Sequence, residues 1–187
     1  MYRLFKDCEC IKNLSFIKAN IPNINNMSYM FCQCTSLEKI DFSNFKTNKV
    51  KNMSHMFQDC ISLNELNLNN FDTSNVTNMS NMFYNCSKLK IINVSHFNTN
   101  KVENMCCMFG ECTSLIKLNL SNFNFNIATK MREMFRGCSS LKELNLPNFY
   151  AFNINNMRSM FAECSDELKK KIIEKNKSIK SLKEVFN

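Results

Sequence analysis

The apolar residues of the chain recur at a fixed spacing of 26 residues. Three series keep this spacing without a gap: the methionines from Met27 to Met157, the phenylalanines from Phe31 to Phe161 and the cysteines from Cys34 to Cys164. A constant period of this length predicts a solenoid, because each repeat can bury its apolar side chains only by stacking on its neighbours.

The first half of each repeat has the spacing of a short amphipathic helix. In one repeat, Met79, Met82, Phe83 and Cys86 follow one another at i, i+3, i+4 and i+7, which places them on one helical stripe. Asn78 stands directly before the stripe, where its side chain can cap the first free amide groups. We therefore predict two helical turns in every repeat.

The second half of each repeat predicts a short strand and a loop. Leu89, Ile92 and Val94 have the spacing Leu-x-x-Leu-x-Leu, whose last part alternates apolar and polar residues. Phe97 and Val102 follow as inward anchors of the loop. Successive strands should run parallel, with identical positions stacked at about 4.8 Å. The predicted fold class is thus an α/β solenoid with one short helix and one short parallel strand per repeat.

The repeat pattern also predicts where the domains begin and end. Residues 1–165 form the solenoid, with a degenerate first repeat at 1–26, five full repeats at 27–156 and a partial repeat at 157–165. Residues 166–187 lack the pattern, begin with a helix-capping Ser165 and Asp166, and are predicted to form a helical cap over the end of the core, broken near 176–178. A basic amphipathic helix at a membrane surface is the alternative for this segment, because residues 169–171 are all lysine.

One outward strand position differs from repeat to repeat while the inward ones do not, as a recognition surface on a rigid scaffold requires; it holds Lys39, Glu65, Ile91, Lys117 and Glu143. We predict that a partner binds this face. Its residues are Lys39, Asp41, Glu65, Asn67, Ile91, Asn93, Lys117, Asn119, Glu143 and Asn145. The set that begins with Asp41 has a structural interpretation as well, as a ladder in which each side chain bonds to the next.

The formal net charge of +8, from 24 basic and 16 acidic residues, raises the question of nucleic-acid binding. The basic residues do not stack along the repeats: Lys49 and Lys101 share their position with Asn75, Ile127 and Asn153. We interpret the charge as a solvated basic surface, so nucleic acid is an unlikely partner. No segment has the length of a transmembrane helix.

Eleven cysteines invite a disulfide or metal interpretation. Those of the repeat series share the inward face with methionine and phenylalanine, which indicates buried free thiols. Two Cys-x-Cys pairs, formed by Cys8, Cys10, Cys32 and Cys34, could form a zinc cluster, but the spacing is not typical of structural zinc and half the ligands would have to leave the core. Cys106 and Cys107 would open a helix and are interpreted as an exposed, oxidisable pair.

No arrangement of residues points to catalysis. His55 and His96 occupy different positions of their repeats, and there is no phosphate-binding glycine loop, separate carboxylate pair or Ser, His, Asp grouping. We predict a protein that is not an enzyme and that holds no cofactor and no metal.

The whole repeat resembles a known family. Its pattern, Asn-Met-Ser-x-Met-Phe-x-x-Cys-x-Ser-Leu and then Asn-Phe-x-Thr-x-x-Val-x-Asn-Met, is similar to the 26-residue repeat of BspA-like bacterial surface proteins, which also occur in mycoplasmas. Residues 71–79, Phe-Asp-Thr-Ser-Asn-Val-Thr-Asn-Met, match best. The resemblance implies a right-handed solenoid like that of leucine-rich-repeat proteins, and a role in adhesion or protein recognition at a cell surface.

The sequence leaves more than one interpretation open for both the function and the cellular location. The binding module for a protein or a cell-surface polymer competes with a structural spacer within a longer surface protein. A basic solenoid that binds nucleic acid or a membrane surface is the weaker alternative. The resemblance implies a cell-surface location, whereas the absence of a secretory signal and the expected free thiols favour the cytoplasm. The chain is expected to act as a monomer or as part of a longer protein.

Overall fold

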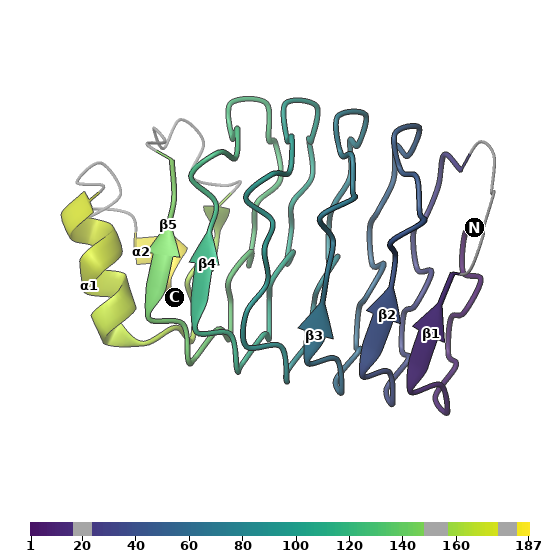
Figure 1. Cartoon of the computed structure of the whole chain (residues 1–187). Helices are drawn as coiled ribbons and strands as arrows, with labels where there is room; N and C mark the ends of the chain where they lie inside the picture. Colours follow the sequence, from purple (N-terminus) through teal and green to yellow (C-terminus); the bar gives the residue numbers. More distant parts are fainter. Residues whose placement is uncertain (17–23, 148–156, 176–182) are drawn as a thin grey trace.

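The computed structural model describes residues 1–16, 24–147, 157–175 and 183–187. In these ranges the chain winds through a row of similar units, ordered along the molecule as they are along the sequence (Figure 1). The strands are β1 (Asn13–Ser15), β2 (Lys39–Asp41), β3 (Glu65–Leu66), β4 (Lys117–Asn119) and β5 (Glu143–Asn145), and the helices are α1 (Asp166–Lys175) and α2 (Lys183–Phe186).

The strands pair in parallel, and each residue faces the residue 26 positions further along. Ile40 pairs with Leu66, and Leu118 pairs with Leu144. The described strands form a sheet β1-β2-β3 and a sheet β4-β5. In the repeat that lies between the two sheets, Ile91 makes an isolated parallel bridge to Lys117 of β4.

The core consists of the inward side chains of all repeats in one continuous cluster. The methionine, phenylalanine and cysteine series are buried from Met27 to Cys164, as their spacing predicts. Phenylalanine rings from consecutive repeats lie face to face: the centroids of Phe57 and Phe83 are 5.8 Å apart, and those of Phe83 and Phe109 are 5.5 Å apart. Phe83 is thus enclosed by rings of both neighbouring repeats.

The prediction of a short helix in every repeat is wrong. The methionine-to-cysteine stretch is a run of turns whose amide groups alternate between two kinds of partner. The amide of Phe31 donates to the carbonyl of Met56 in the next repeat at 2.9 Å, whereas the amide of Met30 donates to Met27 at 3.3 Å. Half of the hydrogen bonds that would close a helix therefore join neighbouring repeats.

This backbone depends on left-handed residues at two positions of each repeat. Tyr29 has a φ of 58° and Gln33 a φ of 62°, a region that most side chains avoid. The equivalent positions agree throughout the described repeats; they are Arg3, Asp7, His55, Asp59, Asn81, Asn85, Cys107, Glu111, Glu133, Gly137, Ser159 and Glu163. Turning the backbone at these points keeps Met, Met, Phe and Cys on one side without a helix.

The asparagines predicted to cap a helix do bond to the start of each methionine-to-cysteine stretch, but the backbone that they cap is a turn. The side-chain oxygen of Asn78 accepts from the amide of Ser80 at 3.0 Å and from its hydroxyl at 2.8 Å. Asn26 and Asn52 make the same bond to the amide two residues on. Lys130, which interrupts the asparagine series, keeps the backbone bridge to Asn104 without such a side-chain acceptor.

Buried threonines add further bonds between repeats. The hydroxyl of Thr47 donates to the carbonyl of Asp72 at 2.9 Å and accepts from the amide of the same residue at 2.8 Å. Thr73 bonds in the same way to Asn98. The buried Phe125 occupies this position one repeat beyond Thr99, so the side-chain bond is replaced there by apolar packing.

The C-terminal segment starts as the sequence predicts. The Ser165 hydroxyl accepts from the amide of Leu168 at 3.3 Å, which caps α1, and α1 buries Leu168 and Ile172 in the common core. The predicted break near 176–178 lies outside the described residues. Beyond it, Val185 is buried and Phe186 stacks on Phe161 with centroids 5.7 Å apart.

Residues 183–187 occupy the place that a further methionine stretch would take. The amide of Ser159 donates to the carbonyl of Glu184 at 2.6 Å, and that of Phe161 donates to Val185 at 2.9 Å. The first bond has the same offset in sequence as the bond from Tyr29 to Ser54, whereas the second is shorter by one residue than the bond from Phe31 to Met56. At the other end, Leu4 is 53% exposed although its counterpart Met30 is fully buried, because no described residue lies beyond it.

Candidate binding face of the sheet

Two rows of outward side chains run along the exposed face of the sheet. In β2, β4 and β5 the first and third residues are exposed and the middle one is buried, as the alternation of a strand requires. The variable row consists of Lys39, Glu65, Ile91, Lys117 and Glu143. The Asx row consists of Asp41, Asn67, Asn93, Asn119 and Asn145.

The variable row contains two exposed ion pairs that join neighbouring repeats. Nζ of Lys39 lies 3.1 Å from Oε2 of Glu65, and Nζ of Lys117 lies 2.6 Å from Oε2 of Glu143. The hydrogen bond and the charge of Lys117 lower the pKa of the Glu143 carboxyl. Exposed ion pairs of this kind contribute little to the stability of a fold. Their main effect is to hold the four charged side chains in defined positions along the variable row.

Ile91 stands between the two pairs. Its side chain is 68% exposed, the largest exposure among the large apolar side chains of the described residues. The backbone bridge between Ile91 and Lys117 holds it in register with β4. An apolar residue with charged groups on both sides has the layout of a small interface, with an apolar centre and a polar rim.

The Asx row does not form the ladder of side chains that was the structural alternative. Its oxygens accept bonds from the backbone two residues on in the same repeat: Asp41 from Ser43 at 2.8 Å, Asn67 from Asn69 at 3.0 Å, Asn93 from Ser95 at 3.2 Å and Asn119 from Ser121 at 3.1 Å. A short Asx side chain reaches the amide of its own turn more easily than the next repeat.

The bonds of the Asx row give these residues a structural role at the end of each strand. The amide and hydroxyl of Ser43 lower the pKa of the Asp41 carboxyl by hydrogen bonding to it. Asn145 is the exception, because Pro147 has no amide hydrogen to donate. The variable row is therefore the better candidate for contact with a partner. The sequence analysis did not predict the ion pairs of this row, although residues of opposite charge 26 positions apart indicate them.

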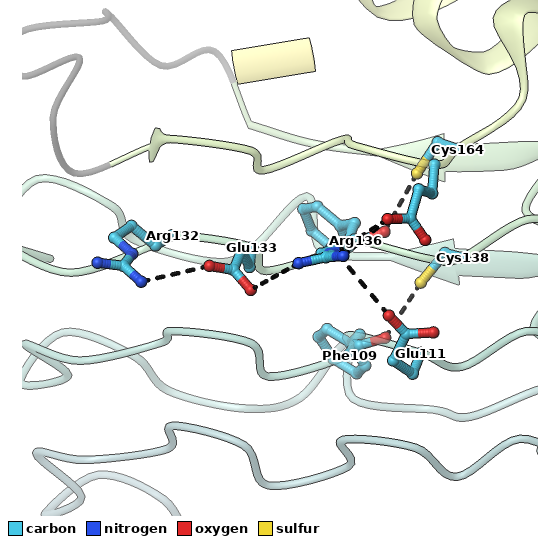
Figure 2. A network of polar contacts seen from close by, with 9 residues as sticks. Phe109, Glu111, Arg132, Glu133, Arg136, Cys138 and Cys164 are labelled. Atoms are coloured by element: carbon cyan, nitrogen blue, oxygen red, sulfur yellow. Dashed lines mark hydrogen bonds and ion pairs between the residues drawn. The ribbon is translucent and has the colours of Figure 1, made fainter. Parts of the chain in front are cut away.

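The methionine-to-cysteine stretches carry a second set of charged side chains on their outer side. Figure 2 shows Arg136 between Glu133 and Glu111. Its guanidinium nitrogens lie 2.8 Å from Oε1 of Glu163, 3.6 Å from Oε2 of Glu133 and 4.0 Å from Oε1 of Glu111. These carboxylates raise the pKa of Arg136. One cation thus links three consecutive repeats, and Arg132 adds a contact to Glu133 at 3.3 Å.

The two histidines have separate structural contacts. His55 stacks on Tyr29 with ring centroids 4.2 Å apart, and its Nδ1 lies 2.5 Å from Oε1 of Gln58. His96 lies near the other half of its repeat, with Nε2 at 3.0 Å from the carbonyl oxygen of Leu68. The two imidazoles therefore belong to different sites, as their positions in the repeat predict.

The cysteine series is a row of thiols that donate hydrogen bonds. Cys86 Sγ donates to the carbonyl of Phe57 at 3.2 Å, and Cys112 Sγ donates to the carbonyl of Phe83 at 3.1 Å. Burial raises the pKa of the Cys112 thiol from 9.0 to about 12. The cysteines from Cys34 to Cys164 in this series are free and buried, as predicted, whereas Cys8 of the first repeat is free but only half-buried.

Cys106 and Cys107 differ from the prediction of an exposed pair at the start of a helix. Both are half-buried, and no helix lies there to stabilise a thiolate. Burial raises the pKa of Cys106, and it raises that of Cys107 from 9.0 to about 11. The pair is consequently less reactive than an ordinary surface thiol.

The described residues contain no group of three or more His, Cys, Asp or Glu side chains able to hold a metal ion. In the pairs considered for zinc, Cys34 is buried and donates to Phe5, while Cys10 is exposed. None of the helices within the described ranges is long and apolar enough to cross a bilayer. The chemistry that the surface offers is ionic, amide and apolar contact.

A family model described as "Mycoplasma protein of unknown function, DUF285" matches residues 1–91 and again residues 88–187. The chain belongs to this family. The match confirms the resemblance to BspA-like repeats, and it makes the chain a DUF285 repeat protein. No curated protein sequence matches this DUF285 protein significantly.

Two solved structures share its fold. A leucine-rich repeat protein of T. pallidum is 18% identical with a TM-score of 0.55, over 92% of this chain and 74% of the other. A leucine-rich repeat protein of Bacteroides ovatus is 16% identical with a TM-score of 0.53, over 88% of this chain and 44% of the other. The DUF285 protein thus has the fold of leucine-rich-repeat proteins, and it spans less than half of the Bacteroides protein.

Proposed function

We propose that this DUF285 protein is a non-enzymatic binding module that recognises another protein, or a polymer of a cell surface, through the variable row. The observation that carries the proposal is the exposed Ile91 between two ion pairs that neighbouring repeats hold in place. A small apolar anchor within a rim of ordered charges is how many interfaces combine affinity with specificity.

The rigidity of the support favours this face over the rest of the surface. The strands below the variable row are locked by inward residues of the common core and by the turns of the Asx row. A partner that binds here meets side chains whose backbones are already ordered, so little conformational entropy is lost from the scaffold. Adhesion is the form of this activity that the family resemblance implies.

We also propose that the solenoid is right-handed and that residues 166–187 cap it. Parallel strands joined by crossover connections are right-handed in nearly all proteins, which supports the handedness. The burial of Leu168, Ile172 and Val185 in the common core supports the cap. The same contacts support the proposed division into a solenoid at 1–165 and a cap at 166–187.

The test compares capture of a partner by two variants of the immobilised protein. In the first, Lys39, Glu65, Ile91, Lys117 and Glu143 are all changed to alanine. In the second, three exposed charged residues outside the sheet face, Lys46, Glu103 and Lys130, are changed to alanine. The proposal predicts that a partner captured by the parent is lost only from the first variant.

Both variants must first show the unfolding midpoint of the parent, because exposed side chains contribute little to stability. Equal capture by both would contradict a role for the variable row. If the parent and both variants retain no partner at all, a structural spacer becomes the better interpretation.

A further inference from the structure

A groove of about 460 Å³ lies between β5 and α1 at the C-terminal end of the sheet. In Figure 1, α1 stands beside β5, on the side that faces away from β4. The floor of the groove is apolar and is made by Leu144 and Leu146 of the strand region and by Leu168 and Ile172 of the helix. A volume of this size falls within the usual range of about 300–1,000 Å³ for binding pockets.

One wall of the groove is a strand edge with free backbone groups. On β4, the carbonyl of Ile116 accepts from the amide of Lys142 at 2.9 Å, and the amide of Leu120 donates to Asn145 at 2.8 Å. The matching groups on the outer edge of β5 are the carbonyl of Lys142 and the amide of Leu146, which bond to no described residue. An acceptor and a donor are therefore ready for one more strand.

The rim of the groove is positively charged. Glu143 and Lys171 are already held in ion pairs, by Lys117 at 2.6 Å and by Glu167 at 2.7 Å. Lys142 and Lys175 also line the groove, and neither forms an ion pair with any residue in the described part of the chain. Of the charged side chains that line the groove, Lys142 and Lys175 are thus left to meet a ligand. The hydrogen bond and the charge of Lys171 lower the pKa of the nearby Glu167 carboxyl, and the charge of Lys142 lowers it further.

We propose that this end groove binds an extended peptide, which adds to β5 as a parallel strand and places an acidic side chain beside Lys142 and an apolar one over Leu144. Three properties of the groove select this occupant: the free acceptor and donor of the edge, the apolar floor and the unpaired lysines. Strand addition derives affinity from the main chain and specificity from alternate side chains. The end groove shares Glu143 with the variable row, but the proposal does not depend on the function proposed for that row.

The protein's own sequence supplies a probe with the required pattern. In a strand placed one repeat beyond β5, residues 35–44, Thr-Ser-Leu-Glu-Lys-Ile-Asp-Phe-Ser-Asn, would set Glu38 beside Lys142 and Ile40 beside Leu144. The same alignment sets Lys39 beside Glu143. A fluorescein-labelled synthetic peptide of this sequence, with blocked ends, is therefore the ligand for the test.

The experiment titrates the full chain into the labelled peptide and follows fluorescence anisotropy. Lys142→Glu should weaken binding about tenfold, and a peptide with Glu38→Lys should regain that loss on the variant. Lys90→Glu is the matched control, since Lys90 occupies the same position two repeats earlier and lies outside the groove; it should leave the affinity unchanged. Absence of binding, or equal effects of the two substitutions, would overturn the proposal.

Amide hydrogen exchange tests whether the peptide adds as a strand. Saturating peptide should slow exchange of the Leu146 amide at least tenfold, while the amide of Leu120, already bonded to Asn145, should not change. An unprotected Leu146 amide in the bound state would refute strand addition. Changing Lys39, Glu65 and Ile91 of the variable row to alanine should not alter peptide binding, which keeps this test independent of the proposed function.

Discussion

At the scale of single residues, the most constrained positions are those with a left-handed backbone. Twice per repeat the chain adopts a positive φ, and side chains as different as Tyr29, Asp59 and Cys107 occupy these positions. Gly137, with a φ of 72°, is the one glycine among them in the described part of the chain. A Cβ atom at this position would lie 2.6 Å from a carboxylate oxygen of Glu111, so both conformation and space favour glycine.

Gly137→Ala should lower the free energy of unfolding by about 1–2 kcal/mol, the usual cost of a left-handed conformation for an L-residue. The new methyl group should also push Glu111 away from Arg136, which lies 4.0 Å from it. Chemical denaturation of the two proteins measures the loss. In a Glu111→Ala background the steric part disappears, so a smaller loss is expected there. An unchanged midpoint in both backgrounds would contradict the prediction.

At the scale of elements, the cysteine row connects the repeats through neutral thiols. Burial raises the pKa of Cys34 and of Cys112 to about 12, and it raises the pKa of Cys60, Cys86 and Cys138 well above 9.0. The unfolded chain therefore begins to lose these protons near pH 9, while the folded chain keeps them. The contribution to stability is complete below pH 9 and decreases as the pH rises toward the folded values.

We predict that stability falls steeply as the pH is raised from 9 to 11, and that Cys112→Val reduces the slope by up to about 1.4 kcal/mol per pH unit, the linkage of one proton. Urea unfolding at several pH values, with a reducing agent present, measures the slope. Cys10→Ser changes an exposed thiol and serves as the control that should keep the parent slope. Identical slopes for the parent and Cys112→Val would exclude this linkage.

The elements also show how far the sequence analysis reached. The spacing of Met79, Met82, Phe83 and Cys86 correctly predicts that all four are buried. It could not distinguish a helix from a row of turns, because both place residues at this spacing on one side. The deciding hydrogen bonds run to the next repeat, as from Phe83 to Met108 at 2.9 Å, and local propensity does not include them.

At the scale of the whole molecule, the phenylalanine ladder differs between the middle and the end. Phe83 is fully buried between Phe57 and Phe109, with a parallel ring on each side. Phe5 is only partly buried; it stacks on Phe31 and contacts Phe16 edge to face. At the far end Phe186 stacks on Phe161, which continues the ladder beyond the last phenylalanine of the repeat series. The cost of a cavity should therefore depend on its place along the solenoid.

Phe83→Ala should lower the free energy of unfolding by about 3–5 kcal/mol, since the rings on both sides cannot collapse far into the cavity. Phe5→Ala should cost clearly less, because one side of this ring has no neighbouring repeat among the described residues. Denaturation midpoints of the two variants provide the comparison. A larger loss for Phe5→Ala, or a shift near zero for Phe83→Ala, would show that the rings do not share one core.

The sequence alone determined the periodicity, the inward residues and the parallel register, because stacking of identical repeats repeats every apolar position at the same spacing. It also located the exposed strand positions. Only the tertiary structure decided that the Asx row bonds to its own turns, that charges of the variable row pair, and that residues 183–187 continue the methionine stretch. The bonds of the Asx row and the ion pairs depend on distances between side chains that the spacing of residues does not specify. Residues 183–187 lie outside the periodic pattern, so the period does not predict their position.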